Sequence, residues 1–82
     1  MSEELNPEYF LEYIIKNLVA HPEETKIKKV EGKKDTILEI YAHPEDIGKI
    51  IGKNGSVVRS LRNIVSAVNI KEKKNYIIEI ID

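Results

Sequence analysis

The sequence predicts a small α+β domain in which three helices pack on one face of a three-stranded mixed sheet. Apolar residues recur with helical spacing in two segments, 7–20 and 56–69, whereas 25–30, 36–42 and 76–81 alternate as strands do. With a short helical segment before the second long helix, the element order is αββααβ. A chain of 82 residues with 41% hydrophobic content can bury one core of this kind and cannot divide it into two.

The first helix is predicted to begin at Pro7 and to end near residue 20. Asn6 supplies an N-cap, Pro7 fits the first helical position because its missing N–H is not needed there, and Glu8 lies near the positive helix end. The helix should stop before Pro22, since a residue that precedes proline avoids helical angles. Its apolar surface covers more than half of the circumference, through Tyr9, Phe10, Leu11, Tyr13, Ile14, Ile15, Leu18 and Val19.

The three strands are predicted to form a mixed sheet. Residues 25–30 are rich in lysine, which is typical of a protected sheet edge, and the short turn at Gly32 makes them antiparallel to 36–42. Two helices separate 36–42 from 76–81, so these strands can lie side by side and parallel. Alternation predicts that Leu38, Ile40, Tyr76 and Ile78 face the helices, and that Ile37, Tyr41, Ile77 and Ile81 lie on the open face.

Two further helices are predicted between the second and third strands. Proline and carboxylates in HPED, residues 43–46, fit the first turn of a short helix that ends at Gly52. The longer helix begins at Ser56, with an apolar face of Val57, Val58, Leu61, Ile64, Val65 and Val68 opposite Arg59, Arg62, Asn63 and Ser66. We expect residues 1–6 to be flexible and 71–75 to form an exposed loop.

Composition argues against several classes of protein. No apolar run approaches the roughly 20 residues that span a bilayer, and the first residues are acidic where a secretory signal is basic, so we expect a cytoplasmic protein without a membrane partner. Without cysteine there is no disulfide framework. His21 and His43 have no third ligand nearby in the sequence, so we expect capping or surface roles for them, with no metal and no cofactor.

The charge is distributed unevenly along the chain. A net charge of −1 is unusual for a nucleic-acid-binding domain, which is commonly basic. Residues 1–24, however, carry six acids and one lysine, a net charge of −5, whereas the rest carries twelve bases and eight acids, a net charge of +4. The chain is therefore expected to have an acidic and a basic side.

The functional signal lies in GKIIGKNGSVVRSLRNI, residues 48–64. Three of the four glycines, Gly48, Gly52 and Gly55, fall within eight residues and alternate with lysines. Glycine reverses the chain between two helices, and its missing Cβ lets a phosphate approach the backbone at the start of the next helix. Cations that can neutralise phosphodiesters are Lys49, Lys53, Arg59 and Arg62. Neighbouring aliphatic side chains suit unpaired bases better than a duplex.

The residues IGKIIGKNGSVVRSLRNIV resemble the helix, Gly-x-x-Gly loop and helix of a KH domain, and the element order resembles the type II form. The length, the acidic start and the motif HPEDIGKIIGKNG further resemble the KhpA-like family of small bacterial KH proteins. This resemblance implies one KH domain over residues 1–82, with its loop at 52–55.

The resemblance also implies single-stranded RNA in a groove, with the loop clamping about four nucleotides. Gly52 and Gly55 become the hinge glycines, and Val58 lines or supports the groove. The implied RNA-binding residues are Ile47, Gly48, Lys49, Ile51, Gly52, Lys53, Asn54, Gly55, Ser56, Val58, Arg59 and Arg62. The family further implies an RNA chaperone or post-transcriptional regulator that forms a homodimer and can pair with a KhpB-like KH protein.

Simpler interpretations stay open. The loop can be a turn without a ligand, Arg59 and Arg62 can be merely solvated, and the chain can be an adaptor that works through homo- or heterodimerisation with weak or no RNA binding. An enzyme is not expected: a Walker loop that starts at Gly48 needs glycine where Lys53 stands. We expect replacement of Gly52 and Gly55 by aspartate to abolish RNA binding and to leave the fold intact.

Overall fold

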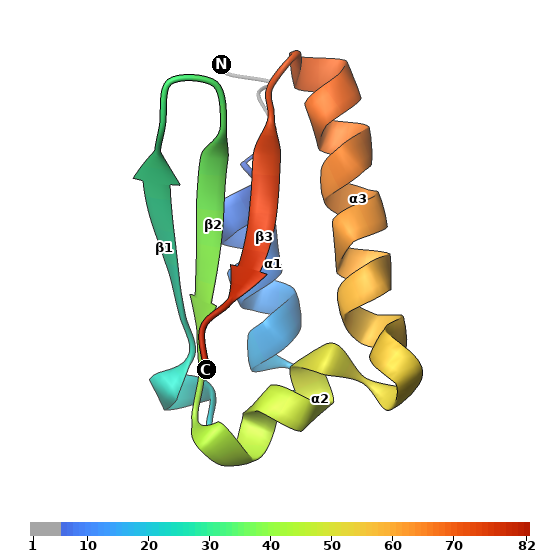
Figure 1. Ribbon diagram of the computed structural model, residues 1–82. Coiled ribbons are helices and arrows are strands. Elements are labelled where there is room, and N and C mark those ends of the chain that lie inside the picture. The colour runs from blue at the N-terminus through green and yellow to red at the C-terminus, as the bar shows by residue number, and fades with distance from the viewer. Residues whose placement is uncertain (1–5) are drawn as a thin grey trace.

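The computed structural model describes residues 6–82 and confirms the predicted α+β architecture and element order (Figure 1). The elements are α1 (Pro7–Lys16), the 3₁₀ turn η1 (Pro22–Glu24), β1 (Lys26–Glu31), β2 (Thr36–Tyr41), η2 (Pro44–Asp46), α2 (Ile47–Ile51), η3 (Lys53–Gly55), α3 (Ser56–Glu72) and β3 (Tyr76–Ile80). Asn6 caps α1 by accepting a hydrogen bond from the Tyr9 N–H. Of residues 1–6, which were expected to be flexible, 1–5 lie outside the described part of the chain, whereas Asn6 is held in place as the cap of α1.

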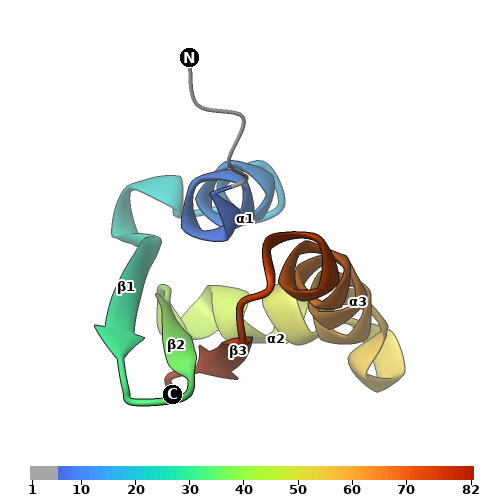
Figure 2. The same cartoon turned by 90° about the horizontal axis from the view of Figure 1, so that it is seen from above.

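The sheet has the strand order β1-β2-β3, with β1 antiparallel and β3 parallel to β2. Figure 2 shows α1 and α3 on the same side of this sheet. Leu38 pairs with Ile78 and Ile40 with Ile80, and these side chains face the helices, with Leu38 and Ile40 fully buried. Because β3 is at an edge, one side of its backbone is not paired with any other strand that the structure describes.

The core lies between the sheet and the three helices. Its buried members come from every layer: Leu11, Ile15, Leu38, Ile40, Ile50, Leu61, Val65 and Ile78. The apolar face of α3 is narrower than the predicted one, because Val58, Leu61, Val65 and Val68 are buried as expected whereas Ile64 is 42% exposed. On α1, Tyr9 and Tyr13 lie outside the core, at 73% and 67% exposure.

Helix α1 ends at Lys16, earlier than the predicted residue 20. The N–H groups of Ala20 and His21 donate to the two carboxylate oxygens of Asp46, at 3.0 and 2.9 Å. Because a distant side chain satisfies these donors, the chain leaves the helix before the proline requires it to. No local pattern in residues 7–20 encodes this contact.

The connection after α3 is shorter than predicted, because α3 continues to Glu72 and Lys73 ends it in a left-handed conformation. Asn69, in the last turns of α3, then holds the start of β3. Its side-chain amide donates to the Tyr76 carbonyl at 3.0 Å, and its Oδ1 accepts from the Tyr76 N–H at 2.8 Å. This pair of bonds fixes β3 beside α3.

Within residues 6–82, no helix has both the length and the apolar character needed to cross a membrane.

Candidate nucleic-acid interface

The loop between α2 and α3 reverses the chain through three residues with positive φ. Gly52, Asn54 and Gly55 have φ values of 80°, 56° and 74°. Asparagine tolerates the left-handed region better than most residues that carry a side chain, so Asn54 suits its place at the tip. The turn is closed by the Gly55 N–H, which donates to the Gly52 carbonyl at 3.1 Å.

The two glycines of the loop have different surroundings. A Cβ on Gly52 would lie 2.4 Å from Cγ2 of Val57 and 2.7 Å from its backbone nitrogen, whereas a Cβ on Gly55 would have Arg59 Nη2 as its nearest neighbour, at 3.8 Å. The first turn of α3 therefore packs directly on the Gly52 backbone. The expectation that aspartate at both glycines leaves the fold intact is wrong for Gly52, because a side chain there collides with Val57.

Arg59 braces the tip of the loop from the first turns of α3. Its Nη2 donates to the Asn54 carbonyl at 2.8 Å, so the guanidinium lies beside Asn54 and Gly55. Helix α3 begins at Ser56 after Gly55 as its N-cap, and within residues 6–82 no side chain accepts from its first N–H groups. A 17-residue helix presents its positive dipole end at this point, next to an exposed lysine and an arginine. This arrangement can receive a phosphate.

The buried carboxylate of Asp46 anchors the helix that leads into the loop. Asp46 is fully buried. Its two carboxylate oxygens accept the N–H groups of Ala20 and His21, and Nζ of Lys49 lies 3.6 Å from Oδ1. Burial raises the pKa of this carboxyl, but the hydrogen bonds from Ala20 and His21 and the charges of His21 and Lys49 outweigh burial, so the pKa lies below its ordinary value of 3.8. Asp46 is therefore a carboxylate at neutral pH.

A shallow pocket of about 160 Å³ lies between α3 and β3, roughly one helical turn beyond Arg59. It combines a cation, small polar groups and aliphatic side chains beside the unpaired edge of β3: Arg62, Val65, Ser66, Tyr76, Ile77 and Ile78. A surface of this composition can contact a base while the loop holds its phosphate. The sequence did not single out Ser66, Tyr76 or Ile77 for this site, because only the parallel pairing of β2 with β3 brings them beside α3.

These features are matched by a family model. The model described as KhpA/KhpB, KH domain, matches residues 8–80, which include the loop, both flanking helices and all three strands. The chain belongs to the KhpA/KhpB KH-domain family. The fold expected from the resemblance is thereby confirmed.

Three curated relatives illustrate the match, and each is named RNA-binding protein KhpA. The protein of Clostridium acetobutylicum is 42% identical over 71 residues, and that of Clostridium perfringens is 44% identical over 71 residues; each alignment covers 87% of this chain and 95% of the relative. The protein of Borreliella burgdorferi is 38% identical over 82 residues, the whole of both chains. No solved structure gives a significant match.

Not all the residues expected from the KH resemblance lie at the surface of this KH domain. Lys53, Asn54, Ser56, Arg59 and Arg62 are exposed, on the loop or on α3. On α2, Ile51 is 38% exposed, Ile47 is half-buried and Gly48 is exposed, whereas Lys49 is paired with Asp46. Val58 is only 7% exposed. Its position fits a supporting role beneath the groove better than direct contact.

Proposed function

We propose that this chain binds single-stranded RNA, with the Gly52–Gly55 loop holding the sugar-phosphate backbone and the α3–β3 pocket receiving a base. The observation that carries the proposal is the pairing of a glycine-bounded loop with the start of α3, whose first N–H groups are capped by no side chain in the described part of the chain. Lys53 and Arg59 supply the positive charge at that point. The relatives named RNA-binding protein KhpA support RNA over the adaptor alternative.

The surface supports a single strand rather than a duplex. The Gly52–Gly55 loop and the α3–β3 pocket lie along one helix, α3. Beyond Tyr76, whose own N–H and carbonyl are bonded to Asn69, the edge of β3 faces no other strand among residues 6–82, so its backbone groups can meet base edges. In an A-form duplex the base edges of the major groove are out of reach of side chains. The chain has only one phenylalanine, four tyrosines and no tryptophan, so extensive base stacking is not part of the proposal.

The proposal is tested by reversing the charge of the loop tip without touching its hinge glycines. In Lys53→Asp/Asn54→Asp, aspartate replaces asparagine at positive φ, which aspartate also tolerates, so the loop keeps its path. We expect affinity for a single-stranded oligoribonucleotide to fall at least tenfold, measured by fluorescence anisotropy. A variant with unchanged affinity would contradict the proposal.

A matched control makes the same change in charge elsewhere. Lys33→Asp/Lys34→Asn alters the net charge by the same three units in the exposed turn between β1 and β2, at the opposite end of the sheet from the loop (Figure 1). If RNA is held by the loop, this control should retain most of its affinity. Equal losses in both variants would mean that net charge, rather than the loop, decides binding.

Several finer properties, which concern assembly and cellular role, belong to the proposal. One groove that holds about four nucleotides should bind weakly, and a homodimer, or a heterodimer with a KhpB-like protein, would raise avidity through effective concentration. Light scattering on the purified chain tests self-association. We further propose a cytoplasmic, non-enzymatic role as an RNA chaperone or post-transcriptional regulator. Crosslinking to RNA in cells, followed by sequencing, tests that role.

A further inference from the structure

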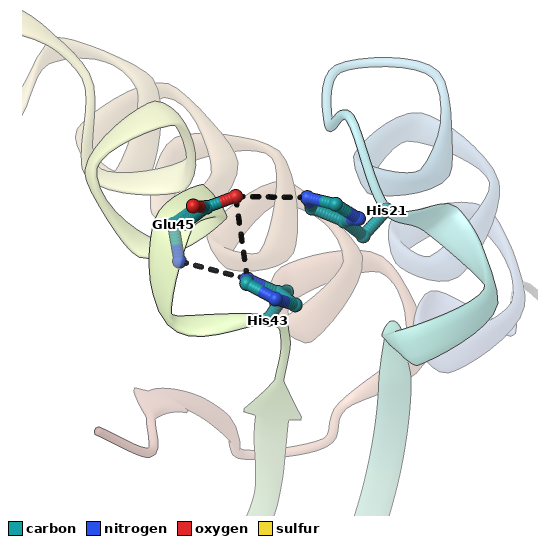
Figure 3. Close-up of side chains that lie close together, drawn as sticks. All are labelled: His21, His43 and Glu45. Carbon is teal, nitrogen blue, oxygen red and sulfur yellow. Dashed lines mark hydrogen bonds and ion pairs between the residues drawn. The ribbon is translucent and has the colours of Figure 1, made fainter.

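Two histidines that are far apart in the sequence meet at the end of the domain near α2 (Figure 3). His21 lies in the connection from α1 to β1, and His43 lies in the connection from β2 to α2. Their rings are stacked, with centroids 4.0 Å apart and an angle of 21° between the planes. The carboxylate of Glu45 lies beside both rings, with Oε1 3.0 Å from Nε2 of His21 and 3.9 Å from Nδ1 of His43.

Capping explains only part of this arrangement. Nδ1 of His43 accepts the Glu45 N–H at 3.0 Å, which accounts for the position of His43. Capping explains neither the stacking of the His21 ring on His43 nor the position of the Glu45 carboxylate, which points toward both histidines (Figure 3). The remaining ring nitrogens also face carboxylates, since Nδ1 of His21 is 3.8 Å from Glu23 and Nε2 of His43 is 3.9 Å from Glu24.

We propose that His21, His43 and Glu45 form a binding site for a divalent transition-metal ion of the Zn²⁺ or Ni²⁺ class. Imidazole nitrogens favour these ions, whereas Mg²⁺ and Ca²⁺ favour sites made of oxygen alone. One donor atom from each residue lies within 4.8 Å of the other two. Donors about 2.1 Å from a tetrahedral ion are about 3.4 Å apart. Because the two rings are stacked and imidazole lone pairs lie in the ring plane, the partly exposed side chains must turn out of the stack to aim both nitrogens at one ion. Water completes the coordination.

The site is held in place before any ion binds. The carboxylate of Asp46 accepts from the backbone N–H of His21, so it fixes the connection that carries His21 against the connection that carries His43 and Glu45. An ion would add a further link between the same two connections, next to the start of α2, in place of the direct contact between His21 and Glu45. It would replace the Glu45 N–H bond to His43 Nδ1, and any proton on Nε2 of His21 would leave to solvent. Glu23 and Glu24 would add negative charge around the ion.

The test uses the full chain without a histidine tag, at about pH 7.5. Metal that binds only the folded state raises the ratio of folded to unfolded protein by 1 + [metal]/Kd, about 100-fold at a hundred times the Kd. Zn²⁺ and Ni²⁺ should therefore raise the Tm by several degrees, whereas Mg²⁺ should leave it unchanged. In NMR spectra, Zn²⁺ should shift the ring C–H signals of both histidines and reach saturation at one ion per chain.

Single substitutions locate the binding. His21→Gln and Glu45→Gln should each reduce metal affinity at least tenfold, and Glu45→Gln keeps every backbone contact in place if the first variant folds poorly. Glu79→Gln removes a carboxylate from the exposed face of the sheet and should leave affinity unchanged. The proposal is overturned if Zn²⁺ and Ni²⁺ leave both Tm and ring signals unaltered. It is also overturned if His21→Gln and Glu45→Gln bind as the unmodified chain does.

Discussion

The backbone of Gly52 lies against Val57 so closely that a Cβ at Gly52 would stand 2.4 Å from Cγ2 of Val57. The contact explains how a five-residue helix and a 17-residue helix can meet across so short a loop. The first turn of α3 packs against the backbone of Gly52, which has no side chain to hold the two apart. As a result, the tip residues, Lys53 and Asn54, project away from the body of the domain.

This contact predicts unequal costs for alanine at the two loop glycines. Both positions have positive φ, so each substitution strains the backbone. Gly55 is left-handed, at φ 74° and ψ 16°, and alanine there costs about 1–2 kcal/mol of folding free energy. Gly52, at φ 80° and ψ 170°, lies in a region that is essentially restricted to glycine, where alanine costs about 1–3 kcal/mol. Gly52→Ala should cost an additional 1–3 kcal/mol or so, because the new methyl group overpacks against Val57. Urea denaturation of the two variants measures the difference. Equal destabilisation would contradict the close packing of Gly52 on α3.

The Asp46 carboxylate predicts a loss of stability in Asp46→Asn. Both oxygens accept backbone N–H groups, and an amide can accept at only one of these two positions. We expect the Tm at neutral pH to fall by about 4–8 °C or more, measured by circular dichroism. Glu79→Gln, at an exposed site, serves as the control and should change the Tm little.

The same residue predicts the direction of acid sensitivity. Because the pKa of Asp46 is lowered in the folded state, its stabilisation is fully present above the ordinary value of 3.8 and is lost as the pH falls through the folded-state pKa. The difference in stability between the unmodified chain and Asp46→Asn should therefore shrink at acid pH. A difference that stays constant from neutral pH to below 3 would show that the carboxylate charge is not involved.

Asn69 predicts a specific loss at the junction of α3 and β3. Asn69→Ala leaves both the N–H and the carbonyl of Tyr76 without their partner, which should cost about 1–3 kcal/mol. Asn63→Ala makes the same substitution at an exposed position of the same helix, where it should be neutral or stabilising by about 0.5 kcal/mol. Denaturant unfolding compares the two. Similar values would mean that the Asn69 bonds do not hold β3 in place.

The regular elements followed from local patterns, and the exceptions follow from contacts between distant residues. Alternation and capping residues predicted the strands and the start of α1, because these signals are local. The early end of α1 depends on Asp46, which is 26 residues from Ala20, and no pattern within α1 encodes it. The buried face of α3 was predicted too broadly, since Ile64 resembles a core residue in sequence, whereas the fold leaves it 42% exposed and places Leu61 and Val65 in the core.

The same distinction, between features encoded locally in the sequence and features created by contacts between distant residues, applies to the candidate sites. The glycines and cations of the loop are contiguous in sequence, so they could be recognised there. The α3–β3 pocket could not, because strand pairing brings Tyr76 beside Arg62. The histidine pair was interpreted as lacking a third ligand, because His21 is distant in sequence from the segment that carries His43 and Glu45. The fold brings the three residues together.

Titration of ¹⁵N-labelled chain with a short single-stranded oligoribonucleotide tests the central claim most directly. We predict that amide signals of Lys53, Asn54 and the first turn of α3 shift most, followed by those along the edge of β3, with a log-log salt slope that falls by about 0.7 when the Lys53 charge is removed. Shifts confined to the open face of the sheet, or to α1, with the loop amides unmoved, would contradict the account.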